Sequence, residues 1–477
     1  MAYISKYLKA HSVSLQTKAA VWYLICNFLQ KGISLISVPL YTRLLTTDQY
    51  GAYQVFCSWV EIFEIITTLR LSWGEYPVGL VKFTEDRDRF TSSMQCMSIT
   101  VTTVFLLLYL LFSDLINRIT GMTTGLTLLL FVLMYAIPAT GFWSGRNRVE
   151  FRYHAVVAVT LVSSFLIPVL GLGSILLTDW GEVGIIAARV LVHGIIGGIL
   201  LWINCRRDFA FYNRKYWVRA IRINLPLLPH YLSTVILNSS DRIMIERLIG
   251  QGEAGIYGVA YSAAMVMNML NSAITSSMQP WLFQRMREHS YEGVSTTVNG
   301  SLVLVAGMSL LLIALAPEAI MILAPPAYQE AIWIVPPLAG SVVVMFFYQH
   351  FLNIEFYYEK SKLITLASAG AALLNLGLNG WLIPIFGYFA AGYTTLLSYL
   401  AFAVVHYIVM RRILKKEGCP TSIADIKGMS LVLIGFFAVA GVLTYSYQFV
   451  RLRYMVLITI IAVAVIKRQF LMKILWK

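Results

Sequence analysis

The chain contains 477 residues, of which 58% are hydrophobic and 13% are charged. Soluble globular domains carry about 25% charged residues, so this composition excludes an ordinary soluble protein and favours an all-helical integral membrane protein. The formal net charge is +14, from 37 Lys and Arg residues against 23 Asp and Glu residues. In a soluble protein such an excess would indicate a nucleic-acid partner, but the apolar composition excludes that class.

Apolar runs of about 20 residues, the length that crosses a bilayer core, recur through the whole chain. Lys467 and Arg468 interrupt the last of these runs. We therefore predict about fourteen transmembrane spans. They cover residues 19–40, 52–72, 92–112, 122–143, 154–177, 183–203, 223–245, 254–280, 299–323, 331–353, 363–385, 388–409, 428–446 and 454–472.

The distribution of Lys and Arg predicts the orientation of these spans, because cytoplasmic loops of membrane proteins are enriched in both residues. When the N-terminus is placed inside, most of the 37 basic residues fall in cytoplasmic loops or at the two termini. We therefore expect a multi-pass protein with both termini in the cytoplasm. The opposite loops hold only Arg43, Arg118, Arg242, Arg247, Arg451 and Arg453.

One cytoplasmic loop, residues 204–222, mixes aromatic side chains with six basic ones. Trp and Tyr favour the membrane–water interface, and basic residues favour anionic lipid headgroups. We interpret this loop as an interfacial helix that lies on membrane lipids. The alternative is a plain basic linker.

An internal repeat divides the chain into two halves. The segment RLL…GAYQV at residues 43–55 matches RLI…GIYGV at residues 247–259 without a gap. The two segments follow spans 1 and 7, which cross the membrane in the same direction, so the repeat is parallel. In transporters with parallel repeats, the two halves are related by an axis along the membrane normal. The predicted parts are an N-lobe (1–203), a connector (204–222), a C-lobe (223–410) and a C-terminal pair of spans (411–477).

Several ionisable residues lie inside spans of the N-lobe, where their cost implies that they face the protein interior or a wet cavity. Lys31 and Glu61 lie at similar depths on antiparallel helices. Lys31 therefore either neutralises Glu61 or Glu64, or leaves one carboxylate available for a proton or Na⁺. The ionisable residues are Lys31 in span 1, Glu61, Glu64 and Arg70 in span 2, and Arg189 and His193 in span 6.

Arg189 and His193 are four residues apart and share one helical face. Because their span contains no acidic residue, they either bind an anionic ligand or are satisfied by carbonyl groups at the end of a neighbouring helix. Arg70 lies near the inner end of its span, where its side chain could instead snorkel to the interface.

The C-lobe carries fewer charges inside its spans. At the outer end of span 7 we expect Asp241 to pair with Arg43, and Arg242 to pair with Glu246. Three residues are expected to be hydrogen-bonded interior histidines: His230, His350 and His406.

Motifs of the common enzyme classes are missing from the sequence. No phosphate-binding loop, GxSxG, HExxH or kinase pattern occurs, so we expect no enzyme. The outer loops are too short for the catalytic domain of a membrane glycosyltransferase or polymerase. The five cysteines are dispersed and form no Cys/His cluster, so we expect no disulfide framework, metal site or cofactor.

Two groups of motifs resemble those of bacterial polysaccharide flippases. The first is PLYTRLL at residues 39–45 with YGAY at 50–53. The second is LPL at 225–227 with DRIMI at 241–245 and GIY at 255–257. Together they resemble the Wzx-like branch, which serves O-antigen, capsule and exopolysaccharide synthesis, within the MOP superfamily that also contains the MATE exporters.

This resemblance implies two six-helix lobes around a cationic lumen in the bacterial cytoplasmic membrane. The implied cargo is an undecaprenyl-diphosphate-linked oligosaccharide that alternating access moves from the inner to the outer leaflet. The implied coupling ion is H⁺ or Na⁺, and the implied pathway partners are a polysaccharide polymerase and glycosyltransferases. The alternative is a MATE-like cation or multidrug antiporter, which would need an acidic cavity.

The resemblance also gives the singled-out residues their expected roles. Lys31, Arg70, Arg189 and His193 would be the cations of the lumen. Glu61 and Glu64 would be candidates for ion coupling. The residues expected to mark the outer mouth and the repeat are Arg43, Asp241, Arg242 and Arg247.

Overall fold

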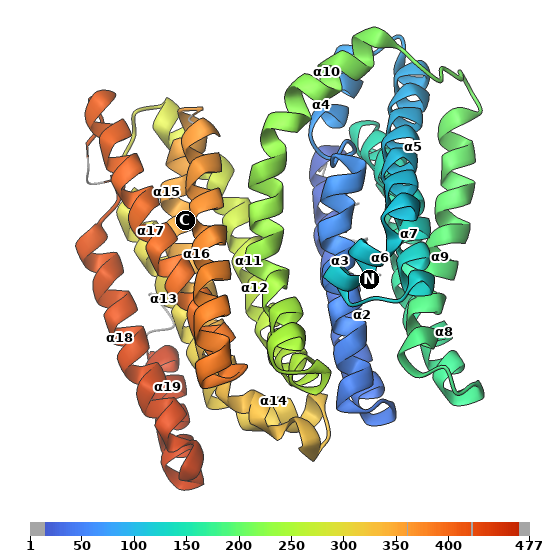
Figure 1. Cartoon of the computed structure of the whole chain (residues 1–477). Coiled ribbons are helices and arrows are strands. Elements are labelled where there is room, and N and C mark those ends of the chain that lie inside the picture. Colours follow the sequence, from blue (N-terminus) through green and yellow to red (C-terminus); the bar gives the residue numbers. More distant parts are fainter. Residues whose placement is uncertain (1–14, 360, 421–422, 467–477) are drawn as a thin grey trace. The chain divides into compact units, whose positions relative to one another are not determined.

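The computed structural model describes residues 15–359, 361–420 and 423–466, and this part of the chain contains helices and no strands. The expected all-helical fold is confirmed, and a long helix coincides with each expected span (Figure 1). Residues 467–472 of the last expected span lie outside the described residues. The long helices are α2 (Leu15–Leu44), α3 (Thr47–Thr68), α5 (Arg87–Leu111), α7 (Thr124–Val149), α8 (Tyr153–Leu177), α9 (Gly181–Cys205), α11 (Leu228–Leu248), α12 (Gln251–Arg287), α13 (Val294–Ala314), α15 (Val335–Tyr357), α16 (Ser361–Phe386), α17 (Phe389–Lys416), α18 (Ile426–Tyr445) and α19 (Val450–Ile466).

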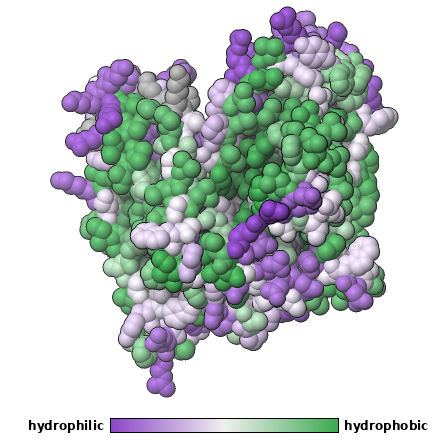
Figure 2. All heavy atoms as spheres, viewed as in Figure 1, coloured by the Kyte–Doolittle hydropathy of each residue, from purple (hydrophilic) through white to green (hydrophobic). Residues whose placement is uncertain are grey.

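Ten helices within the described residues are long and apolar enough to cross a membrane. Hydrophobic side chains cover much of the visible surface, and many hydrophilic ones lie toward its upper and lower ends (Figure 2). The long helices outside this set are α3, α11, α12 and α19. The described part of α19 has only 17 residues, whereas α3, α11 and α12 carry charged and polar side chains. Their charged and polar side chains explain why these three helices fall outside the apolar set.

Short helices follow several of the long ones: α4 (Glu75–Lys82), α6 (Ser113–Thr120), α10 (Arg214–Asn224) and α14 (Ala316–Leu323). The expected span 299–323 is divided, because α13 ends at Ala314 and α14 starts at Ala316. Pro317 lies in the first turn of α14, where the missing N–H of proline costs no helical hydrogen bond. This break was not predicted from the hydropathy of the span.

The chain forms two compact units. Unit 1 comprises Met1–Leu44 and Val55–Val235, and unit 2 comprises Leu45–Gln54 and Ile236–Lys477. In unit 1, α9 packs against α7 and α8, and α2 packs against α8. In unit 2, α15 is the central helix, with α12, α13, α17 and α18 packed around it. Most of α15 is buried.

The internal repeat extends to the helix boundaries. In the first copy, α2 ends at Leu44 and α3 begins at Thr47. In the second copy, α11 ends at Leu248 and α12 begins at Gln251, and both boundaries lie 204 residues after their counterparts. The starts of α3 and α12, both in unit 2, cross in close contact. A β-carbon on Gly51 would lie 1.8 Å from the carbonyl oxygen of Gln251, so this crossing requires glycine.

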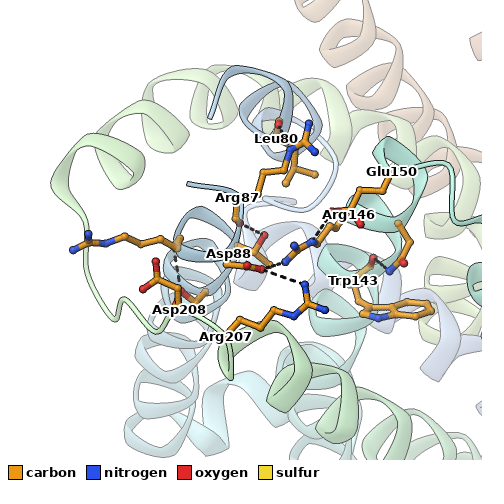
Figure 3. A network of polar contacts seen from close by, with 12 residues as sticks. Leu80, Arg87, Asp88, Trp143, Arg146, Glu150, Arg207 and Asp208 are labelled. Carbon is orange, nitrogen blue, oxygen red and sulfur yellow. Dashed lines mark hydrogen bonds and ion pairs between the residues drawn. The ribbon is translucent and has the colours of Figure 1, made fainter. Parts of the chain in front are cut away.

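Three loops of unit 1 meet at one end, which we call the basic end (Figure 3). Arg146 near the end of α7 pairs with Asp88 at the start of α5, and its Nε lies 3.0 Å from Oε1 of Glu150. Arg207, which follows α9, places Nη1 3.9 Å from Oδ1 of Asp88. The loops that the Lys and Arg distribution assigns to one side of the membrane therefore share one end of the unit.

Helix α10 lies across α4 and α5 at the basic end (Figure 1). The side chain of Asn213 caps α10 and accepts hydrogen bonds from its first turn. Arg219 pairs with the fully buried Glu75, and Trp217 Nε1 donates to the carbonyl oxygen of Ser93 at 3.1 Å. The connector thus contains most of a helix, α10, that packs on α4 and α5 of unit 1, and its contact with membrane lipids stays a prediction.

Candidate substrate and ion sites

A polar stripe runs along the middle of α2. Asn27, Lys31 and Ser34 are exposed and lie at positions i, i+4 and i+7, on one face of a helix apolar enough to span a membrane. A lysine in hydrocarbon is costly, so an exposed lysine in mid-span indicates a wet cavity beside this face. Sequence analysis singled out Lys31 but missed Asn27 and Ser34, although their helical spacing was a usable signal.

Lys31 was expected either to neutralise a carboxylate of α3 or to leave one available for an ion. Among the ion pairs of the described residues, none joins Lys31 to Glu61 or Glu64. Glu61 is exposed and Glu64 is half-buried. Of the two interpretations of Lys31, the ion pair inside the N-lobe is therefore not found.

Arg189 connects α9 to α3. Its Nη1 lies 3.1 Å from Sγ of Cys57, and its charge acts on Glu64 together with the charges of Arg70 and Glu61. His193 is half-buried one turn further along α9. Helix α9, the expected span 6, has no acidic residue beside Arg189, but Glu64 of α3 provides one. Arg70, Arg189, Glu61 and Glu64 thus form one group of cations and carboxylates within unit 1.

Arg70 is fixed at the end of α3 by an unusual backbone. Leu69 and Arg70 have φ angles of 50° and 47°, a left-handed conformation that costs a non-glycine residue about 1 kcal/mol or more. The guanidinium lies 5.2 Å from the ring centre of Trp73 and 5.3 Å from that of Tyr231. Its Nε is buried and has no hydrogen-bond partner in the described part of the chain. Arg70 is therefore held between aromatic rings, which differs from an arginine that snorkels freely.

Arg70 and Arg189, which both act on Glu64, form a cationic group in unit 1, and Lys31 is a further cation on α2; their chemistry suits an anionic ligand. Arginine binds phosphate groups through paired N–H donors, and lysine provides a mobile point charge. Arg70 and Arg189 act on the same carboxylate, Glu64, while Lys31 lies on the exposed face of α2. The assignment of these residues to a substrate stays a prediction.

Asp241 lies at the centre of a buried polar group in unit 2, which we call the Asp241 cluster. Its Oδ2 accepts hydrogen bonds from the hydroxyl groups of Tyr257 at 2.5 Å and Thr395 at 2.8 Å. Its Oδ1 accepts from Nδ2 of Asn379 at 2.7 Å, and Asn375 donates to Thr395 at 3.2 Å. Helices α11, α12, α16 and α17 each contribute to the cluster. Neutral donors inside unit 2 thus reach both carboxylate oxygens of Asp241, and the expected Asp241–Arg43 pair stays a prediction.

Arg242 is also turned into unit 2. Its Nη1 donates to Oε1 of Gln54 at 3.3 Å, and its guanidinium lies 4.7 Å from the ring centre of Tyr261. Oε1 of Glu246 accepts a hydrogen bond from Gln251 at 3.4 Å, and the expected Arg242–Glu246 pair stays a prediction. A spacing of four residues allows an ion pair on a helix, but the aromatic and amide partners of Arg242 come from other helices.

Arg43 and Arg247 occupy equivalent positions in the repeat. Both are exposed, in the last turns of α2 and α11. Arg43 donates from Nη1 to the carbonyl oxygen of Pro39 at 2.9 Å. A basic residue in a last helical turn is stabilised by the helix dipole and by the unsatisfied carbonyl groups there.

A cavity of about 30 Å³ adjoins the Asp241 cluster. This volume accommodates a water molecule or a small ion without its hydration shell. Asn268 lines the cavity, and its Oδ1 is buried without a hydrogen-bond partner among the described residues. Oxygen donors of this kind are the ligands that hard cations prefer, and the carboxylate of Asp241 can also take a proton. Sequence analysis missed Asn375 and Asn379, whose i, i+4 spacing inside an apolar span was the available signal.

His350 and His406 are interior histidines of unit 2 with hydrogen-bonding partners. His350 Nε2 lies 3.3 Å from the carbonyl oxygen of Ile423, and His406 Nδ1 lies 2.8 Å from Oε1 of Glu355. Both are buried, as expected, and His230 is half-buried in α11. Sequence analysis did not single out Glu355, because it lies just beyond the expected end of its span.

Comparison with known proteins identifies the family. The model of a family described as polysaccharide biosynthesis protein matches residues 17–286. No curated protein sequence matches the chain. A structure titled lipid II flippase MurJ, inward closed conformation, has a TM-score of 0.67 and 12% identity over 94% of this chain and 99% of that one.

MATE transporters have the same fold. An inward-facing multidrug resistance MATE transporter of the MOP superfamily has a TM-score of 0.62 and 13% identity, over 81% of this chain and 95% of that one. A mutant of the Vibrio cholerae MATE transporter VcmN has a TM-score of 0.54 and 14% identity, over 86% of this chain and 98% of that one. The chain is a multi-pass membrane protein with the fold of MOP transporters and flippases, and it belongs to the polysaccharide biosynthesis protein family.

Proposed function

We propose that this protein moves an undecaprenyl-diphosphate-linked oligosaccharide from the inner to the outer leaflet of the bacterial cytoplasmic membrane, for the synthesis of a surface polysaccharide. The observation that carries the proposal is the set of cations in unit 1, of which Lys31 and Arg189 lie on helices apolar enough to span a membrane. A diphosphate is the part of such a cargo that carries charge, and Lys31, Arg70 and Arg189 are suited to bind it. Membership of the polysaccharide biosynthesis family supports the same cargo class.

In this proposal the protein works by alternating access through a cationic lumen. Residues 1–203 form the N-lobe, 204–222 the connector, 223–410 the C-lobe and 411–477 the C-terminal pair of spans. Both termini lie in the cytoplasm, because the basic end gathers loops rich in Lys and Arg. Glycosyltransferases would supply the cargo and a polymerase would consume it.

Two places suit a coupling ion, H⁺ or Na⁺. Glu61 and Glu64 are carboxylates within reach of the cationic group, so protonation there would change the net charge that the cargo meets. The Asp241 cluster offers carboxylate and hydroxyl oxygens beside a small cavity. Movement of a proton or Na⁺ against the cargo is the expected form of coupling.

The competing function is a MATE-like antiporter of organic cations. Glu61 and Glu64 are the observation in its favour, because carboxylates in a wet cavity attract cations. Lys31, Arg70 and Arg189 weigh against it, since cations in unit 1 repel a cationic drug. Resistance to cationic drugs that depends on Glu61 and Glu64 would support this function.

A binding experiment separates the two functions. We expect purified protein to bind undecaprenyl diphosphate at least tenfold more tightly than the uncharged alcohol undecaprenol, and Lys31→Ala and Arg189→Ala to remove most of that difference. The exposed Arg118 on α6 provides a matched control, since Arg118→Ala removes a cation outside the cationic group. Equal affinity for the diphosphate and the alcohol in the wild-type protein would contradict the proposal.

A further inference from the structure

Glu355 and His406 form an isolated ionisable pair inside unit 2. Glu355 on α15 and His406 on α17 are both fully buried, and Oε1 of the first lies 2.8 Å from Nδ1 of the second. Tyr348 stacks on the imidazole with ring centres 5.8 Å apart, and Phe402 meets it edge-on at 4.3 Å. Aromatic side chains thus separate the pair from water.

The remaining polar atoms of the pair have no partners. Glu355 Oε2 and His406 Nε2 are buried and make no hydrogen bond within the described part of the chain. In that part, His406 is the ionisable group whose charge acts on Glu355. Among the ion pairs of the described residues, Glu355 takes part in the one with His406. The two residues are therefore treated as one unit for proton binding.

Counting protons shows which state fits this site. With one proton the pair is neutral overall, either as a carboxylic acid with imidazole or as a carboxylate with imidazolium. With no proton an uncompensated carboxylate remains, and with two protons an uncompensated imidazolium remains. A buried charge without a partner costs several kcal/mol. The state with one proton is therefore the one that leaves no uncompensated charge between α15 and α17.

We propose that Glu355 and His406 form a proton-binding site that holds one proton whenever α15 and α17 are packed together, and that releases it only when these helices separate and water enters. The proton would leave from the shared Glu355–His406 hydrogen bond to water, and it would return to the same atoms on closure. This site does not depend on the cargo proposed above. It is also distinct from Glu61, Glu64 and the Asp241 cluster.

The proposal predicts the pH dependence of unfolding. In an unfolded chain Glu and His have pKa values of about 4.3 and about 6.5, so at pH 7–8.5 the unfolded pair holds almost no proton while the folded pair holds one. Because the folded state binds more protons, the contribution of the pair to stability falls as pH rises above about 6.5. The unfolding equilibrium constant should increase about tenfold per pH unit from this pair alone.

The test is the unfolding of purified protein by SDS in dodecylmaltoside micelles between pH 7 and 8.5, followed by circular dichroism. In the wild-type protein, the logarithm of the unfolding constant should rise with pH by a slope that includes one proton from this pair. Glu355→Gln should lower that slope by about one. His406→Asn should retain the slope, since Glu355 would then hold the proton alone. Glu75→Gln is the matched control, because Glu75 is equally buried but pairs with Arg219. Arginine stays charged, so Glu75 remains a carboxylate and binds no proton on folding, and this variant should leave the slope unchanged.

A second variant keeps the proposal testable if Glu355→Gln does not fold. Replacing both members, as Glu355→Leu with His406→Leu, substitutes an apolar pair, a change that proteins often tolerate. Unfolding in weakly buffered solution at pH 8 with a pH-sensitive dye should then release one proton fewer than the wild-type protein releases. Equal proton release, or equal slopes for the wild-type protein and Glu355→Gln, would overturn the proposal. Transport assays play no part in this outcome, so it is independent of the proposed function.

Discussion

Gly51 and Gly255 allow a sharp test of how the two copies of the repeat meet in unit 2. An added β-carbon would lie 1.8 Å from the carbonyl oxygen of Gln251 at Gly51, and 2.5 Å from that of Thr47 at Gly255. Real β-carbons essentially never approach another atom closer than 3.0 Å. Gly51→Ala must therefore push the start of α3 away from α12 by about 1 Å or more, in an interior that is closely packed.

The magnitude follows from two opposing effects. Overpacking of this kind costs about 1–3 kcal/mol, and replacing glycine by alanine inside a helix gains up to about 1 kcal/mol. Because the clash at Gly51 is with backbone, which cannot move aside like a side chain, we expect a net loss near 2 kcal/mol, or about 30-fold in the unfolding constant. Gly307 and Gly377 have no atom within 4 Å of an added β-carbon, so alanine there should be neutral or stabilising.

The assay is SDS unfolding of the purified variants in dodecylmaltoside. Gly51→Ala and Gly255→Ala should unfold at a lower SDS fraction than the wild-type protein, and Gly307→Ala and Gly377→Ala should not. If Gly51→Ala and Gly307→Ala unfold together, the close crossing of α3 and α12 is refuted.

Three further substitutions have defined outcomes in the same unfolding assay. Arg219→Ala should destabilise unit 1 by about 3 kcal/mol, because it leaves the buried carboxylate of Glu75 without its cation; a loss below about 1 kcal/mol would contradict this. Asp241→Ala should cost about 2 kcal/mol or more, since Tyr257, Thr395 and Asn379 lose their acceptor, and Asp241→Asn should cost less. Lys31→Met should change stability by less than about 0.5 kcal/mol, because Lys31 is exposed on α2, and a large loss would place Lys31 in the packed interior instead.

The helical spans were predictable because a bilayer imposes a length and an apolar composition on each one. The expected span 154–177, for example, corresponds to α8 at Tyr153–Leu177. The repeat was also visible, since Gly51 and Gly255 have to recur where two helices cross closely. The break between α13 and α14 escaped prediction because both segments are apolar, and hydropathy does not detect a change of helix direction.

The partners of the polar residues were less predictable, because they come from distant parts of the chain. Asp241 binds Asn379 and Thr395, which are 138 and 154 residues away. The aromatic rings around Arg70 include Tyr231, on another helix. Sequence spacing identifies neighbours on one helix, such as Arg189 and His193, but the pairing of different helices decides which charge meets which acceptor.

The most direct measurement is transbilayer movement in proteoliposomes that contain an undecaprenyl-diphosphate-linked oligosaccharide in both leaflets. The sugar exposed on the outside is oxidised with periodate, which does not cross the membrane. With the wild-type protein, we expect oxidation to proceed beyond the outer leaflet toward the whole pool. With Lys31→Ala or Arg189→Ala it should stop near half, as in protein-free vesicles. Oxidation that stops near half with the folded wild-type protein, with and without a proton or Na⁺ gradient, would contradict a flippase.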